Sequence, residues 1–248
     1  MRGIDLNCDM GEGYPSDALL MPYISSANIA CGYHAGDMDT MKRTVDLCLQ
    51  YHVAIGAHPS YPDKENFGRT DMLGTGVSLK EIPSLIIEQI NMLQAVCAQA
   101  GARLHHVKPH GALYNRAAVD AEVSTHICNA IASLDASLIL YGLSGSLMET
   151  AARATGLQFR NEVFADRTYE SNGTLRSRSA PGALITDADQ SMKQVLQMIN
   201  KGTVTAIDGK TIPMRAETIC IHGDGPHAVE FAAMIARELK NNGIIIQQ

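Results

Sequence analysis

The sequence contains no tryptophan, only four phenylalanines and no long uninterrupted apolar segment. None of its apolar runs approaches the ~20 residues that a transmembrane helix needs, and no basic segment followed by an apolar one opens the chain. Lysine and arginine are scattered, and the formal net charge of −6 at pH 7 argues against broad nucleic-acid binding. We therefore expect a cytoplasmic protein that binds neither membranes nor nucleic acid.

Several common catalytic and nucleotide-binding signatures are also missing. The chain has no GxxxxGK(S/T) loop and no GxGxxG at the start of a helix, so the usual devices that hold nucleotide phosphates are absent. It also lacks a GxSxG elbow and an HExxH helix. The six cysteines form no Cys-x-x-Cys pair and mostly lie in apolar segments, which is typical of buried, reduced thiols.

Strand-like and helix-like segments alternate along the 248 residues, of which 46% are hydrophobic and 19% charged. We predict seven strands, near 4–9, 27–31, 53–58, 104–108, 137–142, 159–166 and 219–222. Helical patterns lie between them, near 38–51, 79–100, 119–133, 145–155, 187–201 and 226–241. No linker or low-complexity segment divides the chain, so residues 1–248 are expected to form a single α/β domain with a mostly parallel sheet.

Alternation within these strands separates a polar face from an apolar one. In the first strand Asp5, Asn7 and Asp9 share one face, and Ile4 and Leu6 lie on the other. An open sheet covered by helices on both sides would be apolar on both faces. A closed barrel accounts for a polar face that lines the lumen and an apolar face that packs against helices. The pattern therefore predicts a seven-stranded (β/α) barrel, slightly smaller than the eight-stranded TIM type.

Reactive side chains collect where these strands end. The ends include NCDMGEG, CGYHAGD, GAHPSYPD, VKPHGALYN, EVFADRTY and IHGDG. Active sites of such barrels lie at the carboxyl ends of the strands, so we expect these residues to meet at one rim. The catalytic candidates are Asp9, His34, His58, Lys108, His110, Glu162 and His222. The candidates for substrate binding are Asn7, Glu12, Asp37, Asp166, Arg167 and Asp224.

The candidates in the first half of the chain each have a second, structural interpretation. Asp9 and Glu12 suit a metal-binding or acid–base pair, but also a helix cap and a solvated carboxylate. His34, with Asp37 as a candidate partner, and His58 suit metal ligation or proton transfer. Two histidines at strand ends that face one mouth favour function over a purely structural role.

The later candidates also leave alternatives open. Lys108 suits anion binding or carbonyl polarisation if it lies in the barrel mouth. His222 and Asp224 resemble an orienting pair, although Asp224 also suits a helix cap. Arg167 suits bidentate binding of a substrate carboxylate or structural ion pairing. Three histidines away from the rim are assigned structural roles: His52, His105 and His126. The role of His227 is left undecided.

Two segments are long for connections in a barrel, 59–77 and 167–182, and we expect them to act as lids or binding arms at the mouth. Their arginines suit contact with a phosphate or a partner, or simple solvation: Arg69, Arg176 and Arg178. A hairpin with an Asp-Gly turn is expected at 203–214.

Six motifs, in order along the chain, carry a resemblance to a known family: IDLNCDMGEG, SSANIACGYHAGD, VAIGAHPSYPD with NFGR, HVKPHGALYN, EVFADRTY and IHGDG. Together they closely resemble the LamB/YcsF family over nearly the whole chain. The resemblance implies a seven-stranded barrel of the glycoside hydrolase/deacetylase type. It further implies ATP-dependent hydrolysis of the 5-oxoproline (pyroglutamate) lactam to L-glutamate. This chain would be the A component, acting with 5-oxoprolinase subunits B and C.

Within that reaction the residues receive expected roles. Asp9 or Glu162 would be the general base. Lys108 or Arg167 would hold the substrate carboxylate or phosphoryl oxygens. The proton carriers or electrostatic stabilisers would be His34, His58 and His222. ATP would be bound largely by, or together with, the partner subunits, because this chain has no phosphate-binding loop.

Two other classes of function stay open. The first is a metal-dependent amidohydrolase or deacetylase acting alone, with a divalent metal held by Asp9, His34 and His58. The second is a non-catalytic carbohydrate- or lactam-binding module. A binding module would not need so many titratable groups on one rim, so we rank it last.

Overall fold

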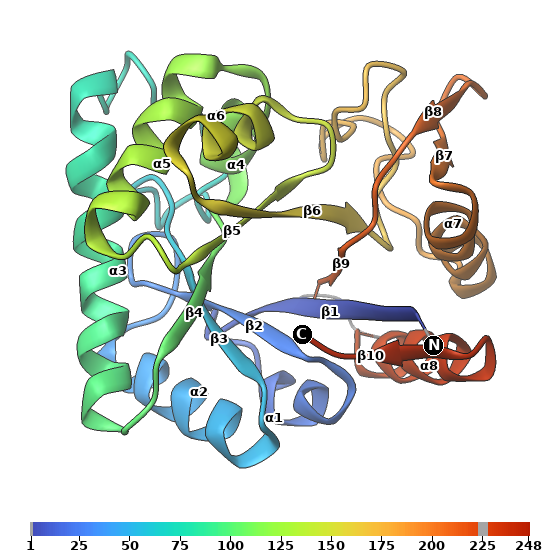
Figure 1. Cartoon of the computed structure of the whole chain (residues 1–248), viewed down its shortest axis with the longest axis horizontal. Coiled ribbons are helices and arrows are strands. Elements are labelled where there is room, and N and C mark those ends of the chain that lie inside the picture. The colour runs from blue at the N-terminus through green and yellow to red at the C-terminus, as the bar shows by residue number, and fades with distance from the viewer. Residues whose placement is uncertain (1, 223–227) are drawn as a thin grey trace.

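Seven parallel strands close into a barrel in the computed structural model, which describes residues 2–222 and 228–248 (Figure 1). The strands pair in the order β1-β2-β3-β4-β5-β6-β9, and β1 closes the ring by pairing Asp5–Cys8 with Thr218–Ile221 of β9. The barrel strands are β1 (Arg2–Met10), β2 (Ser26–Ala30), β3 (Ala54–His58), β4 (Leu104–Val107), β5 (Ile139–Leu143), β6 (Gln158–Phe164) and β9 (Thr218–Ile221). The predicted seven-stranded (β/α) barrel is therefore confirmed.

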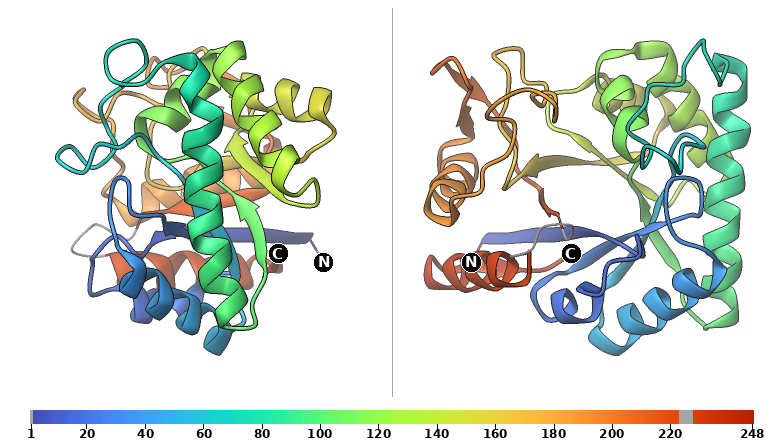
Figure 2. Two further views of the ribbon diagram at one scale, coloured as in Figure 1. Left: turned by 90° about the vertical axis from the view of Figure 1, so that its left-hand side faces the viewer. Right: turned by 180° about the vertical axis from the view of Figure 1, so that it is seen from behind.

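Helices surround this barrel on its outer side (Figures 1 and 2). On one side α2, α3, α5 and α6 pack beside one another in sequence, and α7 and α8 lie across the barrel from them. The helices are α1 (Asp17–Leu20), α2 (Met38–Tyr51), α3 (Ile82–Gln99), α4 (Gly111–Val119), α5 (Ala121–Leu134), α6 (Leu147–Thr155), α7 (Ala188–Lys201) and α8 (Ala228–Asn241), with 3-10 turns η1 (Met21–Tyr23) and η2 (Leu79–Glu81).

Local sequence signals determine where several helices begin and end. Asp37 caps α2 by accepting a hydrogen bond from the Thr40 backbone N–H. Ser78 and Glu81 form a capping box ahead of the longest helix. α6 ends at Gly156, whose φ of 78° is the left-handed conformation that glycine adopts readily.

The sequence reading missed some elements. α4 was not predicted, because Gly111 at its first position, soon after Pro109, resembles a loop. A short strand, β10 (Ile244–Ile246), pairs with the start of β1 and was also missed. Its three-residue apolar segment is too short to distinguish from a tail. Strand and helix ends otherwise differ from the predicted ones by a few residues.

The alternation read from the first strand is confirmed. Asp5, Asn7 and Asp9 are buried in the lumen, where each contacts a polar side chain of another strand. Ile4 and Leu6 belong to the hydrophobic core that packs under the helices. A polar lumen is possible because each buried polar group finds partners on facing strands.

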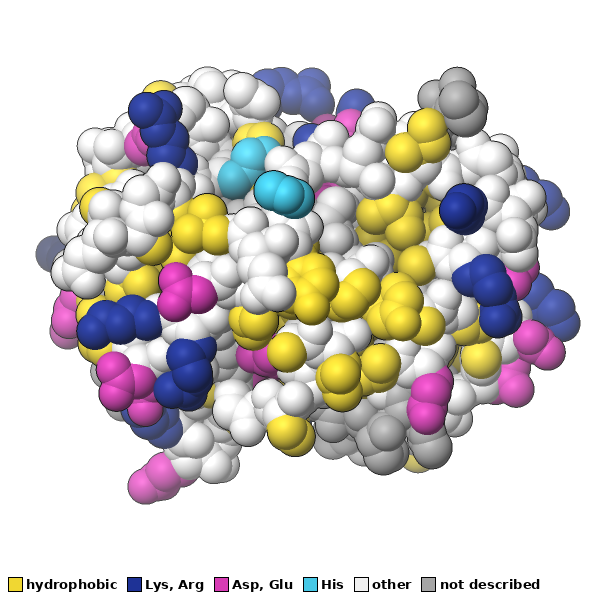
Figure 3. Space-filling view, turned by 90° about the horizontal axis from the view of Figure 1, so that it is seen from below, with side chains coloured by type: hydrophobic (Ala, Val, Ile, Leu, Met, Phe, Trp, Pro, Cys, Tyr) yellow, Lys and Arg dark blue, Asp and Glu magenta, His cyan; other side chains and the backbone are white. Residues whose placement is uncertain are grey.

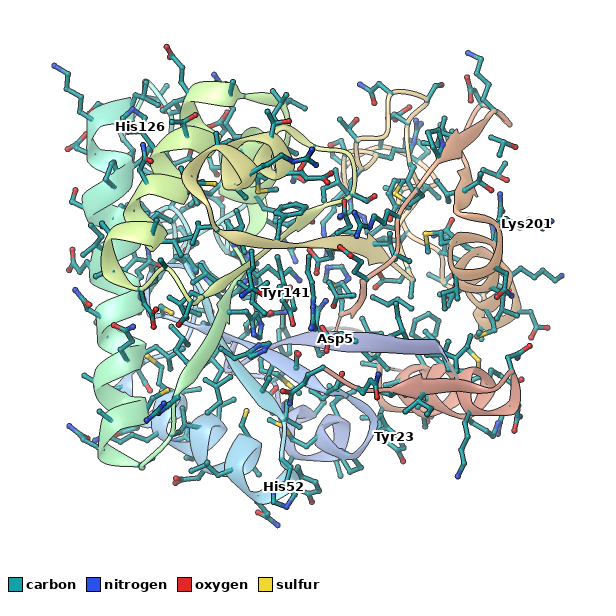
Figure 4. All side chains as sticks on the ribbon, viewed as in Figure 1. Asp5, Tyr23, His52, His126, Tyr141 and Lys201 are labelled. Carbon is teal, nitrogen blue, oxygen red and sulfur yellow. The ribbon has the colours of Figure 1, made fainter. Side chains whose placement is uncertain are left out.

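Polar groups fill the amino-terminal end of the lumen. Asp5 accepts hydrogen bonds from the hydroxyls of Ser25 (2.6 Å) and Ser26 (2.7 Å). The His106 ring stacks on Tyr141, with ring centroids 4.1 Å apart, and Figure 4 shows Asp5 and Tyr141 in the interior. A Cβ at Gly56 would overlap the His106 ring, so only glycine leaves room for this packing. These residues close the barrel floor and leave the opposite end to form the site.

The two long segments and the hairpin lie where the sequence placed them. Residues 59–77 contain no helix or named strand, and the segment after β6 is held by isolated pairings such as Arg167 with Leu184. β7 (Thr203–Thr205) and β8 (Thr211–Pro213) form an antiparallel hairpin. All six cysteines are buried free thiols, as predicted.

The outer surface carries scattered apolar side chains. Figure 3, which looks at the molecule from below, shows hydrophobic side chains across the middle of that face and charged ones mainly toward its sides. No helix among the described residues has the length and apolar character needed to cross a bilayer. Figure 4 places His52 and His126 on the periphery, as their structural interpretation requires.

Candidate active site

A pocket of about 700 Å³ opens at the carboxyl ends of the barrel strands. Its floor includes Asp9 of β1, His58 of β3 and Lys108 directly after β4. Phe67 and Arg69 from the 59–77 segment border one side, and residues 175–179 border another. The convergence of separate strand ends on one rim, expected from the sequence, is therefore present in the fold.

Lys108 occupies the centre of the pocket floor. Its Nζ lies 2.8 Å from Asp9 Oδ1, 3.0 Å from Glu162 Oε1 and 3.3 Å from Asn7 Oδ1. The side chain is only 2% exposed. Burial alone would lower the pKa of Lys108, but the charges of Asp9, Cys220 and Glu162 outweigh it and raise the pKa well above its usual value. Lys108 is therefore a fixed cation beneath the pocket.

Asp9 faces the pocket as a carboxylate. Its Oδ1 accepts hydrogen bonds from Lys108 and from Asn28 Nδ2 at 2.9 Å, and its Oδ2 lies 3.3 Å from His58 Nε2. Burial raises the pKa of the Asp9 carboxyl, but His58 and Lys108 together hold it well below its usual range. Asp9 thus accepts hydrogen bonds but holds a proton weakly.

Three buried polar atoms in or beneath the pocket have no hydrogen-bond partner among the described residues. They are Glu162 Oε2, the Tyr114 hydroxyl and Arg167 Nε. Burial and the charge of Glu162 raise the pKa of the Tyr114 hydroxyl, so it stays protonated as a donor. An unsatisfied buried polar group is costly, and a bound molecule could satisfy the two of these atoms whose residues line the pocket, the Tyr114 hydroxyl and Arg167 Nε.

His222 and Asp166 form a second acid–base pair at the rim. His222 Nδ1 lies 2.8 Å from Asp166 Oδ2, and the imidazole stacks on Phe164. Burial would raise the pKa of Asp166, but His222 lowers it below its usual value. The carboxylate thus orients the ring and leaves the other ring nitrogen for a ligand. A ring nitrogen of His222, an oxygen of Asp9 and Cys220 Sγ all lie within 4.8 Å of one another.

A third group of titratable side chains lies on the other side of Asp9. The rings of His34 and His110 stack with centroids 3.8 Å apart, and His110 Nδ1 is 2.9 Å from His58 Nε2. Glu12 Oε1 lies 3.1 Å from His34 Nε2. Burial and the neighbouring imidazoles lower the pKa of His34 and of His110 well below the usual value. These rings are therefore neutral in the folded protein.

The mouth of the pocket carries excess positive charge, although the whole chain has a net charge of −6. Among its described lining residues, Asp9, Glu12 and Asp71 are the acids. Arg167 is the most buried of the arginines, and its pKa is lowered to about 10 by burial and by Arg178. The cationic lining residues are Arg69, Lys108, Arg116, Arg167, Arg176 and Arg178. Such a surface attracts small anions.

Comparison with known proteins confirms the family resemblance that the sequence motifs indicated. The sequence model of the LamB/YcsF family matches residues 4–248. The chain belongs to the LamB/YcsF family.

Curated relatives and a solved structure resemble this LamB/YcsF chain over nearly their full length. It is 51% identical over 249 residues to the A subunit of 5-oxoprolinase from Bordetella parapertussis, covering 98% of each chain. It is 48% identical over 252 residues to the corresponding 5-oxoprolinase chain of Shouchella clausii, covering 100% of this chain and 98% of the relative. The lactam utilization protein of Thermus thermophilus superposes with a TM-score of 0.91 at 39% identity, covering 99% of both chains.

A more distant structure shares only the fold. The putative cellobiose-phosphate cleavage protein of Enterococcus faecalis superposes with a TM-score of 0.59 at 11% identity, over 99% of this chain and 96% of that one. The LamB/YcsF barrel is thus one form of a wider architecture, and function has to be argued from the site.

Most residues that the sequence nominated in this LamB/YcsF chain come together. Asn7 and Glu162 lie beneath the pocket, where Asn7 Nδ2 donates to Glu162 Oε1 at 3.0 Å. Asp37 does not join them, because it is exposed and caps α2. Asp224 and His227 lie outside the described residues.

Sequence reasoning missed several residues of the site. Asn28 shares its strand face with Ser26, and the same alternation that nominated Asn7 could have found it. Tyr114 lies on α4, a helix that was not predicted. Ser60 and Phe67 act through contacts with His34 and His110 that no local pattern reveals. These contacts join segments far apart in the sequence.

Proposed function

We propose that this chain is the ring-opening component of an ATP-dependent 5-oxoprolinase, which converts 5-oxoproline to L-glutamate. The observation that carries the proposal is that the Asp9–Lys108 pair and the His222–Asp166 pair open into one cationic pocket. The names of the close relatives support the same reaction. The pocket offers both an anion site for the substrate carboxylate and two separate acid–base groups for the amide.

Opening the lactam requires three changes at the amide. Water adds to the ring carbonyl carbon, the bond from that carbon to the ring nitrogen breaks, and the nitrogen takes up a proton. An unstrained five-membered lactam is a poor electrophile, so a phosphoryl group from ATP on the lactam oxygen would activate it. Hydrolysis of the activated ring then yields glutamate and inorganic phosphate.

The contacts in the pocket support a division of labour. Arg167, buried and with an unsatisfied Nε, would bind the substrate carboxylate or phosphoryl oxygens. Lys108 would stabilise the negative charge of the phosphoryl group on the lactam oxygen. Its position among two carboxylates and an amide oxygen holds it in place before substrate arrives.

Proton transfer would involve the pocket-facing acid and the rim histidine. Asp9 lines the pocket whereas Glu162 does not, so of the two expected bases Asp9 is better placed to orient the attacking water. His222, oriented by Asp166, would take the proton from that water and deliver it to the departing nitrogen.

ATP would be bound by, or together with, two partner subunits, B and C. The motivation is the absence of a phosphate-binding loop from this sequence. The decisive experiment measures ATP-dependent glutamate release from 5-oxoproline with this chain added to, or omitted from, its B and C subunits. We expect release only in the complete mixture. Glutamate release by the purified chain alone, or full release without it, would contradict the proposal.

A variant of the anion site tests the substrate's position. Arg167→Gln in the complete mixture should raise the KM for 5-oxoproline by ~10-fold or more, because it removes a charge-assisted contact worth about 1.5–3 kcal/mol. The matched control is Arg153→Gln on the outer helix α6, where the arginine pairs with Glu149 at the surface. An unchanged KM in a folded Arg167→Gln protein would remove Arg167 from the binding site.

The same assay distinguishes the ATP-coupled reaction from that of a stand-alone metal-dependent hydrolase. An enzyme of that class would release product without ATP and without partner subunits, and a chelator would abolish its activity. The ATP-coupled reaction requires the nucleotide in every turnover.

A further inference from the structure

Lys108 brings positive charge to the pocket but has no hydrogen left for a ligand. An ammonium group carries three hydrogens, and four acceptors surround this one. Its Nζ lies 2.8 Å from Asp9 Oδ1 and 3.0 Å from Glu162 Oε1. Asn7 Oδ1 at 3.3 Å and Cys220 Sγ at 3.2 Å complete the set. A hydrogen bond to a ligand oxygen at this place therefore has to come from another side chain.

Tyr114 lies beside this cation. It is the fourth residue of α4, a helix that begins at the rim soon after β4. The first turn of α4 is held there by a hydrogen bond of 2.9 Å from the Ala112 N–H to the Gly68 carbonyl oxygen. The Tyr114 ring meets the Phe164 ring edge-on, with centroids 5.9 Å apart, and Lys108 Nζ lies 5.6 Å from the centroid of the same Phe164 ring. All three of these side chains line the pocket.

The Tyr114 hydroxyl is a donor that has no acceptor among the residues that the structure describes. Tyr114 is only 4% exposed. Burial and the charge of Glu162 raise the pKa of the hydroxyl well above its usual value, so the oxygen keeps its hydrogen. Glu162 Oε2 also lacks a hydrogen-bond partner within this part of the chain, so the two groups are not bonded to each other. A buried, protonated and unpaired donor in a pocket wall costs stability until a ligand accepts from it.

We propose that Tyr114 is a further catalytic residue of the ring-opening reaction, whose hydroxyl donates a hydrogen bond to a phosphoryl oxygen of the activated lactam. This assignment rests on the proposed function. Phosphoryl oxygens carry negative charge and accept strong hydrogen bonds. Lys108 supplies a fixed countercharge, and Tyr114 supplies the hydrogen bond for which Lys108 has no hydrogen. The hydroxyl keeps its hydrogen and takes part in no covalent step.

The timing of this contact gives it a kinetic signature. The phosphoryl group is on the lactam only after its transfer from ATP, so the contact with Tyr114 forms after 5-oxoproline has bound. An interaction that is made only at that stage raises kcat and leaves KM unchanged. Arg167 differs in this respect, because a contact with the substrate carboxylate exists as soon as the substrate binds.

The test is Tyr114→Phe in the complete mixture of this chain with subunits B and C. The substitution keeps the ring against Phe164 and removes only the hydroxyl. We expect kcat for ATP-dependent glutamate release to fall by ~10–100-fold, the range for a hydrogen bond to a charged group, and KM for 5-oxoproline to change by less than ~2-fold. The purified Tyr114→Phe chain should unfold at the urea concentration of the wild type or above it, because the folded chain loses no hydrogen bond.

The matched control is Tyr141→Phe on the barrel floor, for which both results should be reversed. The Tyr141 hydroxyl lies 3.2 Å from Arg160 Nη1 and 3.3 Å from Ser26 Oγ, at the end of the lumen away from the pocket. Loss of these contacts should lower the urea midpoint by roughly 0.5 M. The kcat of the Tyr141→Phe mixture should equal that of the wild type.

Each of three results with Tyr114→Phe would overturn the assignment. Equal kcat values in the variant and wild-type mixtures would show that the hydroxyl contacts no reacting group. A rise in KM with kcat unchanged would place the hydroxyl on the substrate carboxylate. A urea midpoint that falls as in Tyr141→Phe would show that the hydroxyl holds Glu162 in the folded chain. A wild-type mixture that releases no glutamate is a different outcome, which would overturn the proposed function and this assignment with it.

Discussion

Replacing the buried cation Lys108 with methionine is the sharpest perturbation that the lumen allows. Lys108→Met keeps the approximate length of the side chain but removes the charge that lies 2.8 Å from Asp9 and 3.0 Å from Glu162. Glu162 is completely buried, so it cannot replace its lost partner with water. Breaking a buried pair by removing one partner typically costs about 3–5 kcal/mol. We expect a loss of that size in the free energy of unfolding.

Urea denaturation at pH 7 measures this loss. With an m-value of about 2–3 kcal/mol per molar urea, the midpoint should fall by roughly 1–2.5 M. The matched control is Lys80→Met in the exposed turn η2, which should change the free energy of unfolding by less than about 0.5 kcal/mol.

The loss should also depend on pH, with a definite sign. The folded-state pKa of Asp9 lies well below 3.8, so its contribution to stability is present above that pH and is lost as the pH falls through the folded value. Lys108 contributes to that depression, after His58. The pKa of Lys108 is itself raised well above 10.5, so its contribution is fully present up to that pH. The deficit of Lys108→Met should therefore be constant from about pH 4 to 10 and shrink below pH 4.

A double-mutant cycle decides whether charge is the cause. Asp9→Asn combined with Lys108→Met removes one of the two stranded carboxylates, so the double variant should be more stable than the sum of the single losses by about 1–3 kcal/mol. A Lys108→Met protein that unfolds at the wild-type urea concentration would refute the reasoning. Losses that simply add in the double variant would show that packing, not charge, explains the effect.

Three further predictions concern the barrel floor and the rim. Gly56→Ala should lower the free energy of unfolding by about 3 kcal/mol, because its Cβ would overlap the His106 ring; urea unfolding within about 1 kcal/mol of wild type would contradict this. Burial lowers the pKa of His106 well below 6.5, so the contribution of this residue to stability should be fully present above pH 6.5 and be lost below it by up to ~1.4 kcal/mol per pH unit; in pH-dependent denaturation, His106→Gln should reduce the slope by that amount. Asp166→Asn should lower kcat for glutamate release in the complete mixture by ~100-fold or more, because His222 loses the carboxylate that orients it, whereas the surface variant Asp135→Asn should not; equal kcat values would refute this role.

The fold was predictable to the extent that it depends on local patterns. Period-two alternation in IDLNCD placed Asp5, Asn7 and Asp9 on one face, and that single observation distinguished a closed barrel from an open sheet. Helix starts also depend on local signals, such as the capping box of Ser78 with Glu81. Helix α4 was missed because its first residue, Gly111, is a poor helix former, and only packing in the folded chain holds it there.

The site was predictable in its membership but not in its contacts. Strand ends in a barrel meet at one rim whatever their distance in the sequence, so Asp9, His58 and Lys108 could be grouped in advance. Asp37 was grouped with them wrongly, because it lies just before helix α2 and its side chain caps that helix by accepting from the Thr40 backbone N–H. Sequence position alone does not say whether an aspartate caps a helix or faces a pocket.

The sequence by itself determined the barrel, the rim on which the reactive groups lie and the family to which the chain belongs, because period-two alternation and ordered motifs are local properties of the chain. Only the tertiary structure decided how those groups are paired. It alone placed Lys108 between Asp9 and Glu162 and set a carbonyl against one nitrogen of His58 and of His110. Hydrogen-bond direction depends on atoms brought together from distant segments, and no spacing along the chain encodes it.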